Sequence, residues 1–209
     1  MSGFFITLEG PDGCGKSTQI TPLAEYLRSE GRTVWTTREP GGTAISDQVR
    51  RVLMAMKNTS MHPRTEILLF LSARAQLVEE VIRPRLDAGE IVISDRYADS
   101  TLAYQGYGHA YDRELLRRLL EFATGGLQPD LTLLLDIDAE EGLRRRQTGG
   151  GEWNRLDAYQ LAFHRRVQAG YHELTAAEPA RWHTVDATQK PEMVQLALRR
   201  AVDARLQTG

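Results

Sequence analysis

The sequence has little cysteine, little excess charge and no long apolar run. The single cysteine, Cys14, excludes an intrachain disulfide and favours a reducing compartment. The formal net charge of −2 gives no electrostatic reason to expect nucleic acid or a membrane surface as the main partner. The opening segment, MSGFFITLEG, has no basic leader and no long apolar stretch, so we expect neither a signal peptide nor a membrane span. These absences predict a cytoplasmic protein.

The chain is also poor in lysine. Of its 26 basic residues only Lys16, Lys57 and Lys190 are lysines, so a lysine at position 16 raises the question of what arginine could not do there. The length of 209 residues, with 41% hydrophobic and 26% charged residues, is ordinary for a globular chain that buries its core without metals or disulfides. We expect one domain over residues 1–209.

Short apolar runs alternate with longer amphipathic stretches along the whole chain. The apolar runs predict buried strands at residues 4–8, 33–37, 91–93, 131–135 and 182–185. The amphipathic stretches predict helices at residues 16–29, 45–56, 62–86, 112–123 and 155–177, with others after 138 and 191. Pro84 should kink or end its helix. This alternation predicts an α/β fold: a five-stranded parallel sheet flanked by helices on both faces.

A glycine-rich motif follows the first predicted strand and opens the first helix. It matches G-x-x-x-x-G-K-[ST] in its required setting, and comprises Gly10, Pro11, Asp12, Gly13, Cys14, Gly15, Lys16 and Ser17, followed by Thr18. Its backbone N–H groups and the helix N-terminus bind phosphate oxygens. Lys16 is suited to the β- and γ-phosphates and the Ser17 hydroxyl to Mg²⁺. The motif predicts binding of a nucleoside triphosphate.

Charged residues also follow the second and third predicted strands. Ligands of open α/β sheets bind beyond the carboxyl ends of the strands, where Arg38, Asp95 and Arg96 are expected. Two arginines there favour a clamp on a second phosphate, although surface salt bridges are the alternative. Asp95 is suited to a contact with Mg²⁺ or its water, and otherwise to a helix cap or an ion pair with Arg96.

The pair Phe70 and Arg74 and the glycine-rich segment 147–154 each have a purely structural and a functional interpretation. Phe70 and Arg74 share one helix face, where they either stack on and hydrogen-bond a base or serve as a core phenylalanine and a solvent arginine. The glycine-rich segment 147–154 is either an idle surface loop or a mobile lid. Four arginines flank it: Arg144, Arg145, Arg146 and Arg155. A lid would close these cations over the reacting phosphates and exclude water.

With these motifs in place, the chain resembles the bacterial thymidylate kinases, nearly from end to end. The resemblance rests on Glu9–Thr18, on Thr37–Gly42, on Phe70 with Ser72–Arg74, on Asp95–Tyr97 with Ser100, Thr101 and Ala103–Gly106, on Pro129–Thr132 and on Asp186–Ala187. It implies a P-loop kinase fold with a lid at about 143–156, transfer of the γ-phosphoryl group of ATP to dTMP, use of Mg²⁺ and a homodimer.

The resemblance also implies roles for single residues. Asp12 would bind the sugar 3′-hydroxyl of dTMP, and Arg38 and Arg96 its 5′-phosphate. Phe70 would stack on thymine, Arg74 would hydrogen-bond the base, and Thr101 and Gln105 would lie near the base edge. Tyr104 would crowd the sugar 2′ position.

The lid arginines are the open part of this assignment. Some family members have arginine directly after the acid of the P-loop, whereas this chain has Gly13 and resembles the type that supplies the cation from the lid. We expect Arg155 to act on the transferring phosphoryl group and Arg144 to bind ATP, although the unusual lid leaves the choice among the four arginines open. Lys16, Arg38, Arg96 and Asp12 complete the expected catalytic set.

Two rival functions remain. A kinase of another nucleoside monophosphate, or of a deoxynucleoside, could share the fold. An unphosphorylated acceptor would leave the positive charges of Arg38 and Arg96 without an anionic partner, which argues against a deoxynucleoside kinase. A nucleotide-dependent switch protein belongs to a different class, but a GTPase would need an N-K-x-D element, and the sequence has none.

Overall fold

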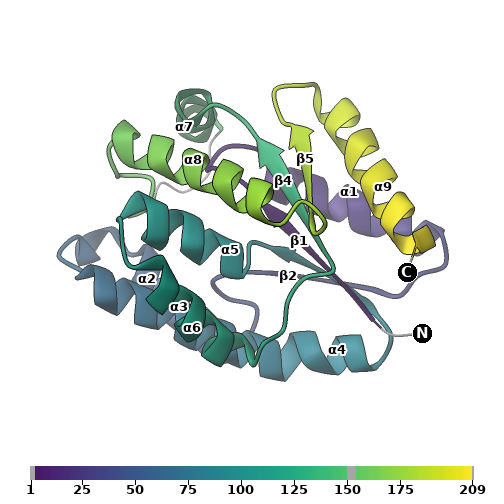
Figure 1. Ribbon diagram of the computed structural model, residues 1–209, viewed down its shortest axis with the longest axis horizontal. Coiled ribbons are helices and arrows are strands. Elements are labelled where there is room, and N and C mark those ends of the chain that lie inside the picture. Colours follow the sequence, from purple (N-terminus) through teal and green to yellow (C-terminus); the bar gives the residue numbers. More distant parts are fainter. Residues whose placement is uncertain (1–2, 150–153, 209) are drawn as a thin grey trace.

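The computed structural model describes residues 3–149 and 154–208. In this part of the chain five parallel strands form one sheet in the order β2-β3-β1-β4-β5 (Figure 1). The strands are β1 (Phe4–Glu9), β2 (Val34–Arg38), β3 (Ile91–Asp95), β4 (Leu131–Asp136) and β5 (Trp182–Asp186). All five strands predicted from the sequence are confirmed, with ends that differ by at most two residues.

Helices connect the strands and cover the sheet. They are α1 (Lys16–Ser29), α2 (Ala44–Met54), α3 (Pro63–Leu77), α4 (Arg83–Asp87), α5 (Ala98–Thr101), α6 (Arg113–Thr124), α7 (Ala139–Thr148), α8 (Leu161–Ala177) and α9 (Pro191–Thr208). A 3₁₀ turn, η1 (Met56–Asn58), and two π-helical segments, η2 (Val78–Ile82) and η3 (Leu102–Gly108), complete the set. No helix in the described ranges has both the length and the apolar character to cross a membrane.

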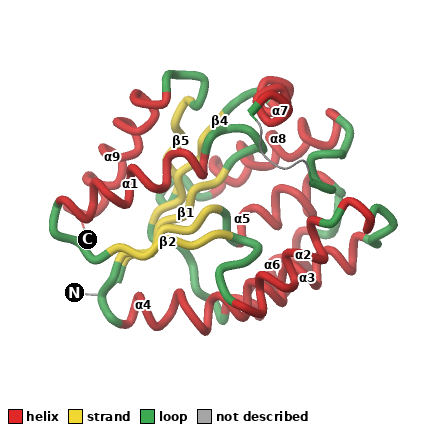
Figure 2. The backbone as a smooth tube through the Cα atoms, turned by 180° about the vertical axis from the view of Figure 1, so that it is seen from behind, coloured by secondary structure: helices red, strands yellow, loops and turns green. Residues whose placement is uncertain are grey.

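The two faces of the sheet have separate cores. Side chains alternate between the faces along a strand, so Ile6 and Leu8 of β1 pack with α1 and α9, whereas Phe5 packs toward η2 and Tyr97. A further cluster joins Leu134 of β4 to α3, η3, α6 and α8. Figures 1 and 2 show α1 and α9 side by side on one side of the strands, with α3, α6 and α8 on the other.

Helix ends follow local chemistry. Asp112 and Asp138 cap α6 and α7, because each carboxylate accepts two backbone N–H groups of the first turn. The side chain of Glu141, in the first turn of α7, pairs with Arg144 and Arg145.

One prediction about the helices needs correction, and one helical segment was missed. Near Pro84, predicted to kink or end its helix, α3 ends at Leu77, a wider π-helical turn, η2, follows, and Pro84 lies in the first turn of α4. The helix predicted from Arg155 begins only at Leu161, because residues 155–160 form turns. The helical segment α5–η3, over residues 98–108, was not predicted at all.

Candidate active site

A pocket of about 440 Å³ lies at the carboxyl ends of the central strands. Most of the residues predicted for the site line it: Asp12, Gly13, Gly15, Lys16, Ser17, Thr18, Arg38, Phe70, Arg74, Asp95, Arg96, Thr101, Tyr104 and Gln105. Gly10, Pro11 and Cys14 belong to the same glycine-rich loop but do not line the pocket. The loop after β1, the ends of β2 and β3, the helix α3 and the segment α5–η3 therefore meet at one cavity.

The glycine-rich loop folds tightly against α7. Gly10, Gly13 and Gly15 have φ values of 140°, 78° and 94°, where residues with a Cβ are strained. A Cβ at position 13 would collide with the carbonyl oxygen of Gly142 in α7. A Cβ on Gly142 would in turn lie 2.5 Å from the carbonyl oxygen of Asp12. Two glycines thus allow the loop and α7 to touch through their backbones.

Lys16 begins α1 and is only 7% exposed. Its ammonium group donates to the carbonyl oxygens of Gly10 (3.0 Å) and Pro11 (2.9 Å) and to Cys14 Sγ (3.3 Å). A compact ammonium with three donors fits within this loop, and the larger planar guanidinium of arginine is a poorer match. The small space inside the loop therefore favours lysine over arginine at position 16.

Ser17 and Asp95 come together as the sequence predicts. Ser17 Oγ donates to Asp95 Oδ2 at 2.6 Å, and both residues line the pocket. Hydroxyl and carboxylate oxygens are hard donors of the kind that Mg²⁺ takes beside phosphate oxygens and water. Among the described residues no group of three or more His, Cys, Asp or Glu side chains could hold a metal ion. The pair therefore fits an ion completed by ligands from phosphate and water.

Asp12, Arg96 and Tyr104 form one buried polar unit. Asp12 Oδ1 accepts from Arg96 Nη2 at 2.7 Å, and its Oδ2 accepts from the Tyr104 hydroxyl at 2.6 Å. Tyr104 Oη also accepts from Arg96 Nη2 at 3.0 Å. Burial alone would raise the pKa of Asp12, but the charges of Arg96 and Lys16 outweigh it and lower that pKa. Asp12 is therefore an ionised hydrogen-bond acceptor inside the pocket.

Arg96 is also held by its backbone conformation and by a second set of hydrogen bonds. Its backbone φ of 72° is in the left-handed region, which is uncommon for residues other than glycine. Its Nη1 donates to Ser100 Oγ (3.0 Å) and Tyr171 Oη (3.1 Å), and both hydroxyls donate to Glu9. Glu9 is fully buried, and burial together with the charge of Asp99 raises its pKa to about 7. Sequence reasoning did not assign Glu9 or Ser100 to the site.

Arg38 is the more exposed of the two predicted phosphate-binding arginines. Its side chain is 58% exposed and lies 3.5 Å from Asp47. Arg50, from α2, lines the same part of the pocket and donates to the carbonyl oxygen of Pro40 at 2.8 Å. Burial and the nearby charge of Arg38 lower the pKa of Arg50. Arg50 was missed because an arginine in the middle of an amphipathic helix carries no signal of the side it faces.

Arg74 is a buried pocket residue, 1% exposed, rather than a solvent arginine. Its Nη2 lies 2.6 Å from Glu39 Oε2, and its Nη1 donates to Thr101 Oγ1 at 2.9 Å. Glu39 precedes a cis peptide bond to Pro40. Phe70, one helical turn before Arg74, lines the same end of the pocket. The pair therefore has the placement that a base-binding role needs.

The arginines around the predicted lid are placed differently from our expectation. Arg145 and Arg146 line the pocket, whereas Arg144 and Arg155 do not. Arg144 is 65% exposed and pairs with Glu141 at 2.7 Å. Arg155 is 4% exposed and pairs with Glu66 at 2.5 Å. In this structure neither Arg144 nor Arg155 lines the pocket, and their assignments to ATP and to the phosphoryl group stay predictions.

The remaining lining residues come mainly from loops. They are Glu39, Pro40, Met54, Ser100, Gly149, Asn154 and Leu156. Asn154 and Leu156 end the predicted lid, whose residues 150–153 lie outside the described part of the chain. Across the base of that segment Arg146 Nη2 donates to Asp157 Oδ2 at 3.1 Å, and the side-chain amide of Asn154 donates to the same oxygen at 2.6 Å. These contacts join α7 to the turn before α8.

The sheet order and the phosphate loop define a P-loop kinase fold, and a family model described as thymidylate kinase matches residues 8–197. The chain is 53% identical over 199 residues to a thymidylate kinase of Roseiflexus sp. (strain RS-1), covering 90% of this chain and 88% of that protein. It is 46% identical over 209 residues to a thymidylate kinase of Exiguobacterium sp. (strain ATCC BAA-1283 / AT1b), covering 100% and 98%. The crystal structure of thymidylate kinase from Ehrlichia chaffeensis superposes with a TM-score of 0.79 at 33% identity, covering 97% and 99%. The chain belongs to the thymidylate kinase family.

Proposed function

We propose that the chain transfers the γ-phosphoryl group of ATP to dTMP, giving ADP and dTDP for dTTP synthesis. One observation supports this above all others. The phosphate loop and a second group of cations, Arg38, Arg50 and Arg96, line the same pocket of about 440 Å³. Bringing two polyanions together requires positive charge on both sides of the transferred group.

The donor end of the pocket is the phosphate loop. Its backbone N–H groups and the N-terminus of α1 would hold the ATP phosphates, with Lys16 as a point charge. Arg145 and Arg146 approach from α7 and would screen the charge that develops during transfer. We assign to them the role first expected of Arg144 and Arg155. They support the assignment to the bacterial type that has glycine at position 13 and arginines in a lid at about 143–156.

The acceptor end is built from arginines and one carboxylate. Arg38 and Arg96 would hold the 5′-phosphate of dTMP, and the ionised Asp12 would accept a hydrogen bond from the 3′-hydroxyl. A phosphate monoester is mostly dianionic at pH 7 because its second pKa is about 6. The attacking oxygen therefore carries no proton, and the site needs no general base.

The base end would be formed by Phe70, Arg74, Thr101 and Gln105. Phe70 would stack on thymine, and Arg74, held by Glu39, would donate to a base carbonyl. Tyr104 is held by Asp12 and Arg96 and would lie where a 2′-hydroxyl would project. This arrangement favours a deoxyribonucleotide with thymine.

Mg²⁺ would be held by Ser17 and Asp95, whose oxygens are adjacent. When bound, the ion would supply positive charge beside the phosphates of ATP.

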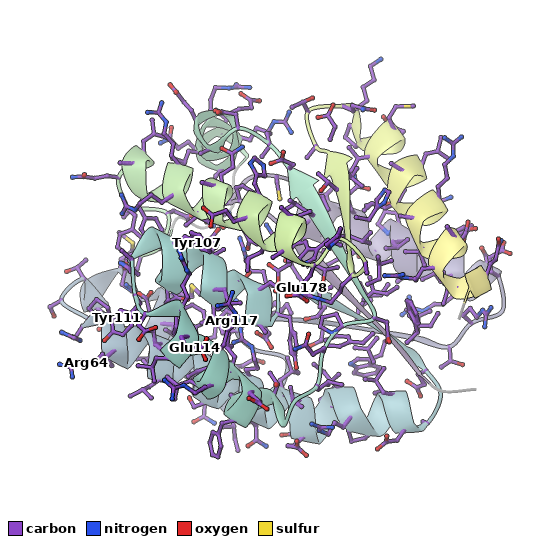
Figure 3. All side chains as sticks on the ribbon, in the orientation of Figure 1. Arg64, Tyr107, Tyr111, Glu114, Arg117 and Glu178 are labelled. Atoms are coloured by element: carbon purple, nitrogen blue, oxygen red, sulfur yellow. The ribbon has the colours of Figure 1, made fainter. Side chains whose placement is uncertain are left out.

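A homodimer is proposed on the exposed apolar side of α2, α3 and α6, where α3 packs against both α2 and α6. Large apolar side chains are exposed there: Ile45, Val52, Leu68, Leu115 and Phe122, the last of these 88% exposed. Exposed apolar patches of this kind mark protein interfaces. Two exposed charged residues of α6, Glu114 and Arg117, are labelled in Figure 3. The single-domain organisation and the cytoplasmic location remain predictions.

Acceptor profiling tests the proposed function directly. Purified protein with ATP and Mg²⁺ should form ADP rapidly with dTMP, and slowly with UMP, CMP, AMP or thymidine. Thymidine is the matched control because it differs from dTMP only by the phosphate. Faster turnover with another monophosphate, or with thymidine, would favour one of the rival kinases. ADP formation at the same rate without any acceptor would favour a nucleotide-dependent switch protein.

A further inference from the structure

A buried carboxylate, Glu66 of α3, lies behind the base end of the pocket and is 1% exposed. One oxygen, Oε1, accepts from Gln105 Nε2 at 2.7 Å. The other, Oε2, accepts from Arg155 Nη2 at 2.5 Å and from the Tyr159 hydroxyl at 3.1 Å. Burial alone would raise the pKa of Glu66, but the neighbouring His109, Arg155 and Gln105 lower it to about 2. Glu66 is therefore ionised at every pH used in enzyme assays.

An ionised carboxylate can only accept hydrogen bonds, so it fixes which way the Gln105 amide points. One N–H of Gln105 Nε2 is committed to Glu66, which fixes the amide orientation and leaves Oε1 as its acceptor for a ligand. Gln105 lines the pocket together with Arg74, which can only donate. Gln105 Oε1 and Arg74 thus present an acceptor and a donor of fixed position at the base end of the pocket.

This pair of groups matches thymine and opposes cytosine. Thymine presents a carbonyl oxygen next to a ring N–H, which suits the donor Arg74 and the acceptor Gln105 Oε1. Cytosine presents an amino group next to a ring nitrogen without hydrogen, which reverses both roles. A buried polar group left unpaired discriminates strongly between such ligands.

The second oxygen of Glu66 supports another wall of the pocket. Arg155 lies between Asn154 and Leu156, which both line the pocket. Arg155 Nε also donates to the carbonyl oxygen of Leu53 at 3.0 Å, and the next residue along α2, Met54, lines the pocket too. One carboxylate thus holds both the base-facing amide and the turn that follows the predicted lid.

We propose that Glu66 is a positioning residue that makes the site selective for thymine, by orienting the Gln105 amide, and that Arg155 serves as its structural partner. This rests on the proposed function, because the base must be read in the pocket of a dTMP kinase.

Glu66→Gln tests the proposal. Gln105 and Arg155 bind different oxygens of Glu66. A glutamine at position 66 replaces one of these two acceptors with an NH2 donor, so the Gln105 amide is free to turn over. We expect the ratio of kcat/KM for dTMP to that for dCMP to fall about tenfold or more. The change should come mainly through KM, because Glu66 does not face the transferring phosphate. Asp99→Asn is the matched control, since it breaks another buried ion pair, with Arg181 at 2.6 Å, that does not line the pocket. It should leave the ratio unchanged.

Two further variants test whether Glu66 controls base selectivity through Gln105, even if Glu66→Gln does not fold. Gln105→Met removes the amide and should lower the dTMP to dCMP ratio to a similar extent. Arg155→Lys keeps a positive charge beside Glu66 and leaves the contact between Glu66 and Gln105 in place, so the ratio should stay within about threefold. An unchanged ratio in Glu66→Gln or Gln105→Met, or a collapsed one in Arg155→Lys, would overturn the proposal. A wild-type protein that does not phosphorylate dTMP would instead overturn the proposed function, and with it this inference.

Discussion

The buried carboxylate of Glu9 makes a sharp prediction about stability and pH. Glu9 ends β1, is fully buried and accepts from the backbone N–H of Tyr97 (2.7 Å), from Ser100 Oγ (2.6 Å) and from Tyr171 Oη (2.9 Å). Burial and the charge of Asp99 raise its pKa from the usual 4.5 to about 7. The folded protein thus binds this proton more tightly than the unfolded chain does.

The sign and size of the effect follow from proton linkage. Between pH 4.5 and 7 the folded protein holds the proton and the unfolded chain has lost it, so raising the pH through this window destabilises the folded state. The stabilisation is fully present below pH 4.5 and is lost above pH 7. A tenfold change in proton affinity corresponds to about 1.4 kcal/mol, so the pKa displacement of Glu9 corresponds to about 3 kcal/mol.

Glu9→Gln removes this titration and keeps the side-chain shape. We expect the free energy of unfolding of the variant, relative to wild type, to rise by about 3 kcal/mol between pH 4.5 and pH 8. Urea unfolding of both proteins at a series of pH values gives this difference, in which the groups common to both largely cancel. Glu79→Gln, an exposed position in η2, should shift stability by less than about 0.5 kcal/mol throughout. A difference between wild type and Glu9→Gln that is flat with pH, or that changes in the opposite direction, would refute the reasoning.

Two further predictions concern the pocket. Gly142→Ala places a methyl group 2.5 Å from the Asp12 carbonyl oxygen, so α7 must move away from the phosphate loop. We expect kcat/KM for ATP to fall about tenfold and the free energy of unfolding to fall by about 1–3 kcal/mol. The control Glu140→Ala, on the exposed side of α7, should change neither quantity. Tyr104→Ala should raise the kcat/KM of UMP relative to dUMP, and Tyr104→Phe should not, because the ring is what would crowd the 2′ position. An unchanged ratio in Tyr104→Ala would place that discrimination elsewhere.

Local patterns were enough to predict much of this molecule. The strands of the sheet stand out because each is a short apolar run bounded by turn residues, and the phosphate loop because its glycines and Lys16 have fixed spacing. The carboxyl-end rule for parallel sheets then placed Arg38, Asp95 and Arg96 at one cavity, as observed. These features depend on neighbours in the sequence or on a topology shared by many proteins.

What the sequence could not settle depends on which way a helix faces. Arg144, Arg145 and Arg146 are consecutive and chemically identical, and the sequence does not show that the second and third line the pocket where α7 meets the phosphate loop. Arg155 was expected at the phosphates, but its partner Glu66 is 89 residues away in the chain. The segment α5–η3 was missed because Gly106 and Gly108 lower its helical signal, although its packing against α8 is extensive.

Arg96 has one more consequence for how the protein meets its ligands. Five acceptors hold its guanidinium, from Gly10, Asp12, Ser100, Tyr104 and Tyr171. The cation is therefore already in position before any nucleotide arrives, and binding need not spend energy on ordering it. Arg38, with more than half of its side chain in water, must give up far more freedom on contact with the same anion. Of the two arginines that would bind the acceptor phosphate, Arg96 is preordered by the core, whereas Arg38 becomes ordered only when the nucleotide binds.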